Sequence, residues 1–178
     1  TLDADGIELA QLRKALPEAD SFSEKSGQPP VFRGYRSNPG SSEPELVGYA
    51  FFTPDFPPEE IGYSAPIYVL VGMDLGGTLT GVNVLYFPES YKSICRAFLA
   101  TQGFQPQFRG KSIADGFLVG RDIDGVSRAT ITSWATSRGV RNASRLVATT
   151  YLTDSEFATS ANQGVSALQL LQDQSWEE

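Results

Sequence analysis

The chain has 178 residues, enough for one domain with a sizeable core, and it carries a net charge of −7. This acidic balance argues against nucleic acid or an anionic membrane surface as the main partner. The sequence has no histidine and only one cysteine, Cys95, which excludes Ser-His-Asp and Cys-His catalysis, metal centres built on His or on Cys clusters, and an internal disulfide.

The first elements expected along the chain are a helix and a β-hairpin. The spacing of apolar residues before Pro17 predicts a helix over residues 5–16. Residues 18–27 are polar and are expected to be irregular. Residues 30–36 alternate apolar and polar side chains and predict an edge strand, with residues 46–53 as its partner across an Asn-Pro-Gly turn.

A second hairpin is expected in the middle of the chain. The Pro-rich residues 54–58 interrupt the sheet, and two runs rich in Val, Leu and Tyr follow, at residues 67–74 and 79–87. Gly76-Gly77 between these runs is a strong hairpin signal. Residues 91–101 then place apolar side chains on one side of a predicted helix.

The last third of the chain predicts more helix than strand. Residues 104–110 are irregular or a short strand, and a helical pattern runs from about Trp134 to Val147. A final helix is expected near residues 165–171. Three arginines interleave with the apolar residues of the Trp134–Val147 helix, and we interpret them as a solvated face: Arg138, Arg141 and Arg145. The alternative is that one of them helps to hold a phosphate or faces an acidic partner.

Hairpins followed by separate helices indicate an α+β fold, an antiparallel β-sheet with packed helices. The predicted core domain is residues 46–153. Residues 1–45 are expected to add a helix and an edge strand to the same unit, and residues 154–178 to form a C-terminal helix or tail.

The stretch from Asp124 to Ser133 joins a turn to a helix start. Asp-Gly favours a turn, and Ser127 and Thr130 are both candidate N-caps of the helix. A helix N-terminus presents unpaired N–H groups and a positive dipole end, which suit a phosphate. Several hydroxyl groups gather at this point of the sequence.

This stretch, Asp-Gly-Val-Ser-Arg-Ala-Thr-Ile-Thr, resembles the flavinylation motif D-x-x-S-G-A-T-x-T of FMN-binding domains. The resemblance implies that Thr130 carries FMN through a phosphoester bond. The chain departs from the motif at Arg128, where the family usually has Gly. If Gly is there for a positive φ, Arg128 strains the loop; if it is there for space, Arg128 points outward.

A second segment narrows the resemblance. Residues 62–74, which begin Gly-Tyr-Ser-Ala-Pro, together with Gly-Val-Asn at residues 81–83, resemble the periplasmic domain of the NosR/NirI family. The resemblance covers roughly residues 46–150. It implies a set of flavin-binding residues around the acceptor: Asp124, Ser127, Ala129, Thr130, Thr132, Ser133, Tyr63 and Ser64.

Aromatic side chains are the expected walls of a flavin ring site, although in strands they more often belong to the core. The sequence offers four candidates: Tyr63, Tyr68, Phe52 and Trp134. No catalytic residue and no metal ligand is predicted.

Resemblance to NosR implies a periplasmic electron-transfer domain that supports nitrous oxide reductase, through its electron supply or the maturation of its copper site. Its partners would be a flavin transferase that depends on FAD and magnesium, and nitrous oxide reductase or its maturation proteins. Membrane attachment would come through regions outside these residues. The alternatives are a non-redox regulatory module of NirI type and a flavin subunit of an Rnf-like or sodium-pumping NADH:quinone reductase complex. The hypothesis that the chain is a free-standing enzyme has the weakest support.

Overall fold

The structure is a computed structural model, and it describes residues 9–58, 60–61, 67–86 and 103–152. The helices predicted at residues 91–101 and 165–171 lie outside the described residues. The described elements in chain order are α1 (Leu9–Ala15), β1 (Ser21–Phe22), β2 (Phe32–Arg36), β3 (Glu45–Phe52), η1 (Thr53–Asp55), β4 (Tyr68–Asp74), β5 (Leu79–Tyr86), η2 (Gln105–Phe108) and α3 (Thr130–Tyr151).

The five strands form one antiparallel sheet in the order β1-β2-β3-β4-β5. Together with the helices this is an α+β fold, as the sequence predicts. Both predicted hairpins are confirmed, with β2 paired to β3 and β4 paired to β5. The prediction that residues 18–27 are irregular is wrong in part, because β1 lies within them and pairs with β2. The edge strand is therefore β1, and the prediction that residues 30–36 form an edge strand is wrong, because β2 lies between β1 and β3.

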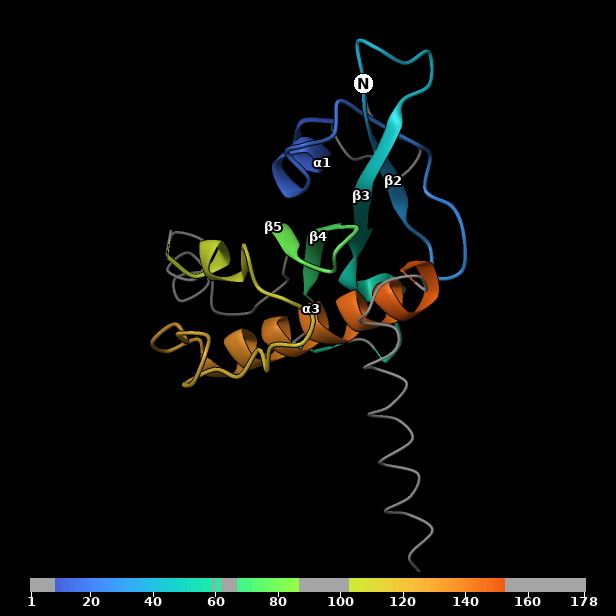
Figure 1. The fold of residues 1–178 in the computed structure, drawn as a ribbon. Coiled ribbons are helices and arrows are strands. Elements are labelled where there is room, and N and C mark those ends of the chain that lie inside the picture. The colour runs from blue at the N-terminus through green and yellow to red at the C-terminus, as the bar shows by residue number, and fades with distance from the viewer. Residues whose placement is uncertain (1–8, 59, 62–66, 87–102, 153–178) are drawn as a thin grey trace, which may run out of the picture.

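One face of the sheet packs against α3, the long helix that runs across the sheet in Figure 1. Side chains alternate between the two faces of a strand, so Val69, Val71 and Met73 of β4 point to the same side. These residues share a buried cluster with Val140 and Val147 of α3. The principal core therefore lies between β4 and α3.

The other face of the sheet receives α1. Leu70 of β4 belongs to a separate buried cluster with Leu12 and Ala15 of α1. Gly72 and Gly81 are register partners on this face, and a Cβ on Gly72 would run into the carbonyl group of Ala15. The absence of side chains at these glycines lets the end of α1 lie directly on the sheet.

Helix α3 is longer than predicted. The sequence pattern places it from about Trp134 to Val147, whereas it runs for 22 residues from Thr130 to Tyr151. Its N-cap is Ala129, which makes no side-chain capping bond, so the predictions of Ser127 or Thr130 as N-cap are wrong. Apolar spacing missed the first turn because hydroxyl residues there are buried by tertiary packing.

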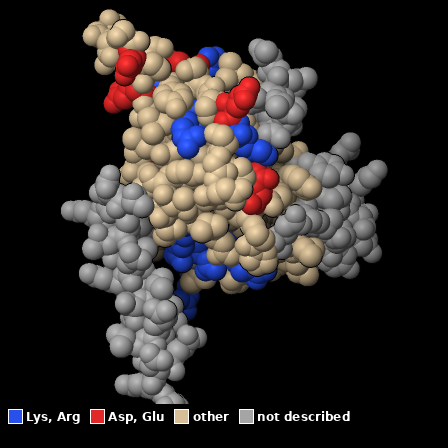
Figure 2. Space-filling view, turned by 90° about the vertical axis from the view of Figure 1, so that its right-hand side faces the viewer, with Lys and Arg blue, Asp and Glu red and all other residues tan. Residues whose placement is uncertain are grey.

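Charged side chains do not form one continuous patch of a single sign on the face drawn in Figure 2, where acidic and basic groups are interspersed. Two of the ion pairs join neighbouring segments of the fold: Lys25 with Asp55 at 3.3 Å, and Arg36 with Glu45 at 3.1 Å. Exposed pairs such as Arg36–Glu45 contribute little to stability. Within the described ranges, no helix has the length and apolar character required to span a membrane.

Candidate functional site

The segment between η2 and α3 has almost no regular structure and is held by buried apolar side chains. One aromatic contact anchors it to η2: Phe117 stacks on Phe108 at 6.1 Å, and Phe108 in turn meets Phe104 edge-on at 5.4 Å. Ile123 and Val126 continue the row of buried residues up to the motif. The path of this loop is thus fixed by core packing.

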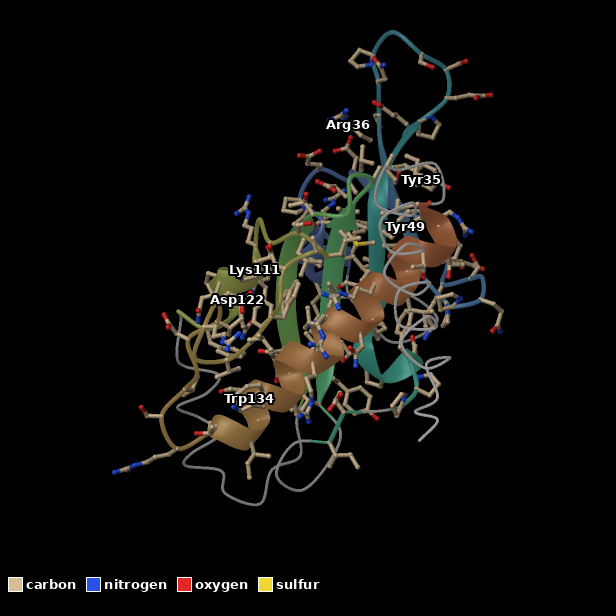
Figure 3. The ribbon with its side chains drawn as sticks, turned by 60° about the horizontal axis from the view of Figure 1, so that its bottom comes forward. Tyr35, Arg36, Tyr49, Lys111, Asp122 and Trp134 are labelled. Atoms are coloured by element: carbon tan, nitrogen blue, oxygen red, sulfur yellow. The ribbon has the colours of Figure 1, made fainter. Side chains whose placement is uncertain are left out.

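Asp122 holds the turn that precedes the motif. Its carboxylate accepts hydrogen bonds from the N–H groups of Phe117 at 2.9 Å and Leu118 at 2.5 Å, and Lys111 Nζ lies 3.3 Å away. Figure 3 shows Lys111 and Asp122 side by side. Partial burial raises the pKa of Asp122, but the N–H donors of Leu118 and Phe117 and the Lys111 ammonium outweigh it, so the pKa is lowered.

The sign of this shift gives Asp122 a defined role in stability. A lowered folded pKa means that the ionised carboxylate stabilises the fold above its unfolded pKa of about 3.9. That contribution is lost as the pH falls through the lower folded pKa. At neutral pH the ionised carboxylate of Asp122 therefore makes its full contribution to the stability of the turn.

The motif itself makes a tight turn just before α3. The N–H of Ala129 donates to the carbonyl of Val126 at 3.0 Å, and Arg128, the third residue of this turn, has a φ of 68°. A turn with a positive φ at its third residue favours Gly or Asn there, because other side chains are strained in that conformation. Val126 and Ala129 are buried, whereas Ser127 and Arg128 are exposed. Gly in the family motif therefore corresponds to a left-handed backbone position, which Arg128 adopts here.

Ser133 holds this turn from inside α3. Its hydroxyl accepts a hydrogen bond from the N–H of Val126 at 3.1 Å and donates to the carbonyl of Ala129 at 2.9 Å. The side chain is fully buried. The two bonds link the first turn of the helix to both ends of the Val126–Ala129 turn.

Thr130 is the first residue of α3, and it is exposed. Among the other predicted site residues, Asp124 and Ser127 are also exposed, while Ala129, Thr132 and Ser133 are buried. The structure therefore groups six predicted residues around one helix start, three at the surface and three beneath it. Tyr63 and Ser64 lie outside the described residues.

Gln107 of η2 is a residue that the sequence patterns did not single out. Its amide oxygen accepts the N–H of Asp124 at 2.6 Å, and its amide nitrogen donates to the Asp124 carbonyl at 3.2 Å. Both backbone groups of the first motif residue are thereby held by one side chain. No pattern in the sequence connects these two positions, because the contact depends on how the loop folds back.

The candidate flavin walls separate into core and surface residues. Phe52 is buried on the α1 face of the sheet, where its ring meets Phe32 at 6.0 Å, so the interpretation of Phe52 as a flavin wall is wrong. Tyr68 is 42% exposed and Trp134 is 36% exposed. Figure 3 shows Trp134 on the first turns of α3, at the end of the helix away from Tyr35 and Tyr49.

Two of the three arginines of α3 tie the helix to neighbouring loops. Arg138 donates from Nε and Nη2 to one carboxylate oxygen of Glu60, at 3.1 and 3.0 Å. Arg145 donates to the carbonyls of Ile113 and Asp115 at 2.9 and 3.0 Å. Arg145, one of the arginines predicted to form a solvated face, therefore holds the loop that precedes the motif.

Comparison with known families accounts for this arrangement. The model of the FMN-binding domain matches residues 62–145, which include β4, β5, η2, the motif turn and most of α3. The domain type of this region therefore matches that of an FMN-binding domain. No curated protein matches the sequence.

The residues of the FMN-binding domain fit the group that its family name implies. A phosphate is favoured at the start of α3 by the helix dipole, by the absence of a capping side chain on Ala129, and by the adjacent Arg128. Within the part of the chain that the structure describes, no group of three or more His, Cys, Asp or Glu side chains could hold a metal ion.

Proposed function

We propose that the FMN-binding domain carries FMN on Thr130, through a phosphoester bond, and relays electrons. The observation that carries this proposal is the exposure of Thr130, the first residue of α3, directly after the turn that contains Arg128 in a left-handed conformation. Apart from Arg128, the turn matches the motif in residue type, and Arg128 adopts the backbone conformation that Gly would favour.

Thr130 is a secondary alcohol and a weak nucleophile at neutral pH, so attachment requires a flavin transferase with FAD and magnesium. Thr130 Oγ1 forms a bond to the FMN phosphorus of FAD, and the pyrophosphate P–O bond breaks. AMP leaves with the electron pair of that bond, and the hydroxyl proton passes to solvent. An acceptor at the surface is accessible to such an enzyme, whereas the buried Thr132 is not.

The charge of the attached phosphodiester is favourable at this position. The diester keeps one negative charge, and the N-terminus of α3 stabilises it by about 0.3–1 kcal/mol at an exposed site. Arg128 is exposed two residues before Thr130 and adds a positive charge nearby. The departure from Gly at this position is therefore compatible with holding a phosphate.

When bound, FMN accepts and passes on electrons one or two at a time. The contribution of the protein is to fix the phosphate and to offer apolar surface to the ring. Trp134 is one helical turn from Thr130 and is partly exposed, so it is the described aromatic residue best placed for that surface. Tyr68 is the second candidate, and Tyr63 and Ser64 remain predictions.

By resemblance to the NosR family, the domain would act on the periplasmic face of the inner membrane. It would support nitrous oxide reductase, either by supplying electrons or by assisting maturation of its copper site. A flavin subunit of an Rnf-like or sodium-pumping NADH:quinone reductase complex is the alternative within electron transfer. The Gly-Tyr-Ser-x-Pro segment at residues 62–66 favours the NosR-like role.

A non-redox binding or regulatory module of NirI type is the second candidate function. Arg128 favours it, because a side chain at the Gly position of the motif could hinder the transferase. This function predicts a folded domain that takes up no flavin.

The test is the intact mass of the domain after co-expression with a flavin transferase. We expect wild type to gain one FMN unit less water, and Thr130→Val to gain nothing. Thr149→Val is the matched control, because Thr149 is another exposed threonine of α3, and this variant should load like wild type. A folded wild-type domain without added mass, beside an active transferase, would favour the regulatory module.

A further inference from the structure

The side-chain amide of Gln107 bonds both backbone groups of Asp124, as the backbone of a neighbouring β-strand would. Asp124 donates its N–H to Gln107 Oε1 at 2.6 Å and accepts from Gln107 Nε2 at 3.2 Å. Asp124 itself is exposed. Its backbone is therefore held by a residue from η2, while its carboxylate remains at the surface beside the motif turn.

A second contact holds the other side of the motif. Ser133 bonds the N–H of Val126 and the carbonyl of Ala129, as described above. Between these two fixed points the chain exposes Ser127, Arg128 and Thr130. The loop is thus pinned at its start by Gln107 and at its end by Ser133, and its exposed residues are presented in one arrangement.

We propose that Gln107 is a positioning residue for flavin attachment to Thr130. This inference rests on the proposed function, because it concerns the loop that the flavin transferase recognises. Without the two bonds to Asp124, the start of the loop samples more conformations. The flavin transferase then meets the binding-competent conformation of the loop less often. Its apparent affinity for the domain falls in proportion to the population of that conformation.

The chemistry of the contact requires an amide of this length. Gln107 provides a donor and an acceptor on one planar group, which matches the C=O and N–H of Asp124. Glu at this position keeps the acceptor but has no donor for the Asp124 carbonyl. Asn has both groups but is one methylene shorter, so it cannot make both bonds without movement of the backbone.

The experiment measures initial rates of FMN transfer by a purified transferase, at saturating FAD and magnesium, with the concentration of the domain varied. Gln107→Ala should raise KM for the domain by about tenfold with little change in kcat, since two ordinary hydrogen bonds are lost. Hydrogen exchange at the Asp124 amide should become faster. Arg109→Ala is the matched control, because Arg109 is exposed and ends the same 3₁₀ segment.

Partial unfolding would also raise the apparent KM, because only folded domain is a substrate. The rates are therefore compared at a temperature at which wild type and variant are both fully folded, and under that condition a raised KM reports positioning and not a general structural role. If Gln107→Ala is poorly folded, Gln107→Glu carries the test, and an intermediate KM is expected. A wild-type KM in either folded variant would overturn the inference. A wild-type domain that accepts no FMN at all would instead refute the proposed function, before any Gln107 variant is compared.

Discussion

Arg128 shows how a single backbone angle explains a family motif. Its φ of 68° places it in the left-handed region, which bulky residues avoid because Cβ approaches the following carbonyl. The sequence allowed two reasons for Gly at this position, positive φ or space. The structure shows the positive φ, and it also shows that Arg128 is exposed.

Replacing Arg128 by Gly should stabilise the domain. Removal of the left-handed strain favours the folded state by about 1 kcal/mol, partly offset by the greater freedom of Gly in the unfolded chain. Denaturant unfolding at pH 7 measures the change. Arg128→Ala is the control, because it removes the charge but keeps Cβ, and it should show no such gain. Equal stability of the two variants would contradict the strain argument.

Helix α3 connects Thr130, the proposed FMN acceptor, to the core. Its first residue is Thr130, and its buried side includes Val140 and Val147 against the sheet. A helix of 22 residues spans about 33 Å, so its two ends lie far apart. At the far end, Tyr151 stacks on Tyr49 at 5.3 Å and donates its hydroxyl to the Pro29 carbonyl at 2.6 Å. The end that holds Thr130 thus belongs to a helix that is anchored in the core and at its far end.

Trp134 on this helix should contact the ring of an attached flavin. Helical side chains lean toward the N-terminus, so the indole covers the turn that holds Thr130. Indole donates an electron to an excited flavin on contact and quenches its emission. In the flavinylated domain, Trp134→Leu should therefore lengthen the flavin fluorescence lifetime.

The control for this experiment is Leu146→Ala, which removes another exposed apolar side chain of α3, three turns further along. Its flavin lifetime should equal that of wild type. A wild-type lifetime in Trp134→Leu would mean that the ring lies against another surface, for which Tyr68 is the next candidate.

At the scale of the whole molecule, the sheet separates two packing layers. Val69, Val71 and Met73 face α3, whereas Leu70 and Gly72 face α1. The Thr80 hydroxyl also donates to the Ala15 carbonyl at 2.7 Å on the α1 side. Substitutions between α1 and the sheet should therefore change the free energy of unfolding without changing the structure at the start of α3.

Gly72→Ala tests this separation. The new Cβ would meet the Ala15 carbonyl, which belongs to the backbone and cannot move cheaply, so a loss of about 1–3 kcal/mol in unfolding free energy is expected. Flavin loading of the folded protein should be unchanged. Gly103→Ala is the control, since its Cβ would meet nothing within 4 Å. Equal stability of the two variants would argue against close packing of α1, and loss of loading in folded Gly72→Ala would argue against independent layers.

Local patterns were sufficient to predict several elements. Two runs rich in Val, Leu and Tyr, with Gly76-Gly77 between them, located β4, β5 and their hairpin, because strand pairing across a short turn depends on neighbouring residues. The motif around Thr130 indicated the domain type for the same reason, since its residue types and spacing are contiguous. These features depend on residues that are close together in the chain, so they can be predicted from the sequence.

Contacts between distant segments decided the rest. β1 exists because it pairs with β2. The first turn of α3 is helical although its apolar spacing is poor, because Thr132 and Ser133 are buried and Ser133 bonds to Val126 of the loop. The bond between Gln107 and Asp124 has no sequence signature at all. Each of these features gains its free energy from contacts between residues that are not neighbours in the chain, so the pattern of adjacent side chains does not reveal them.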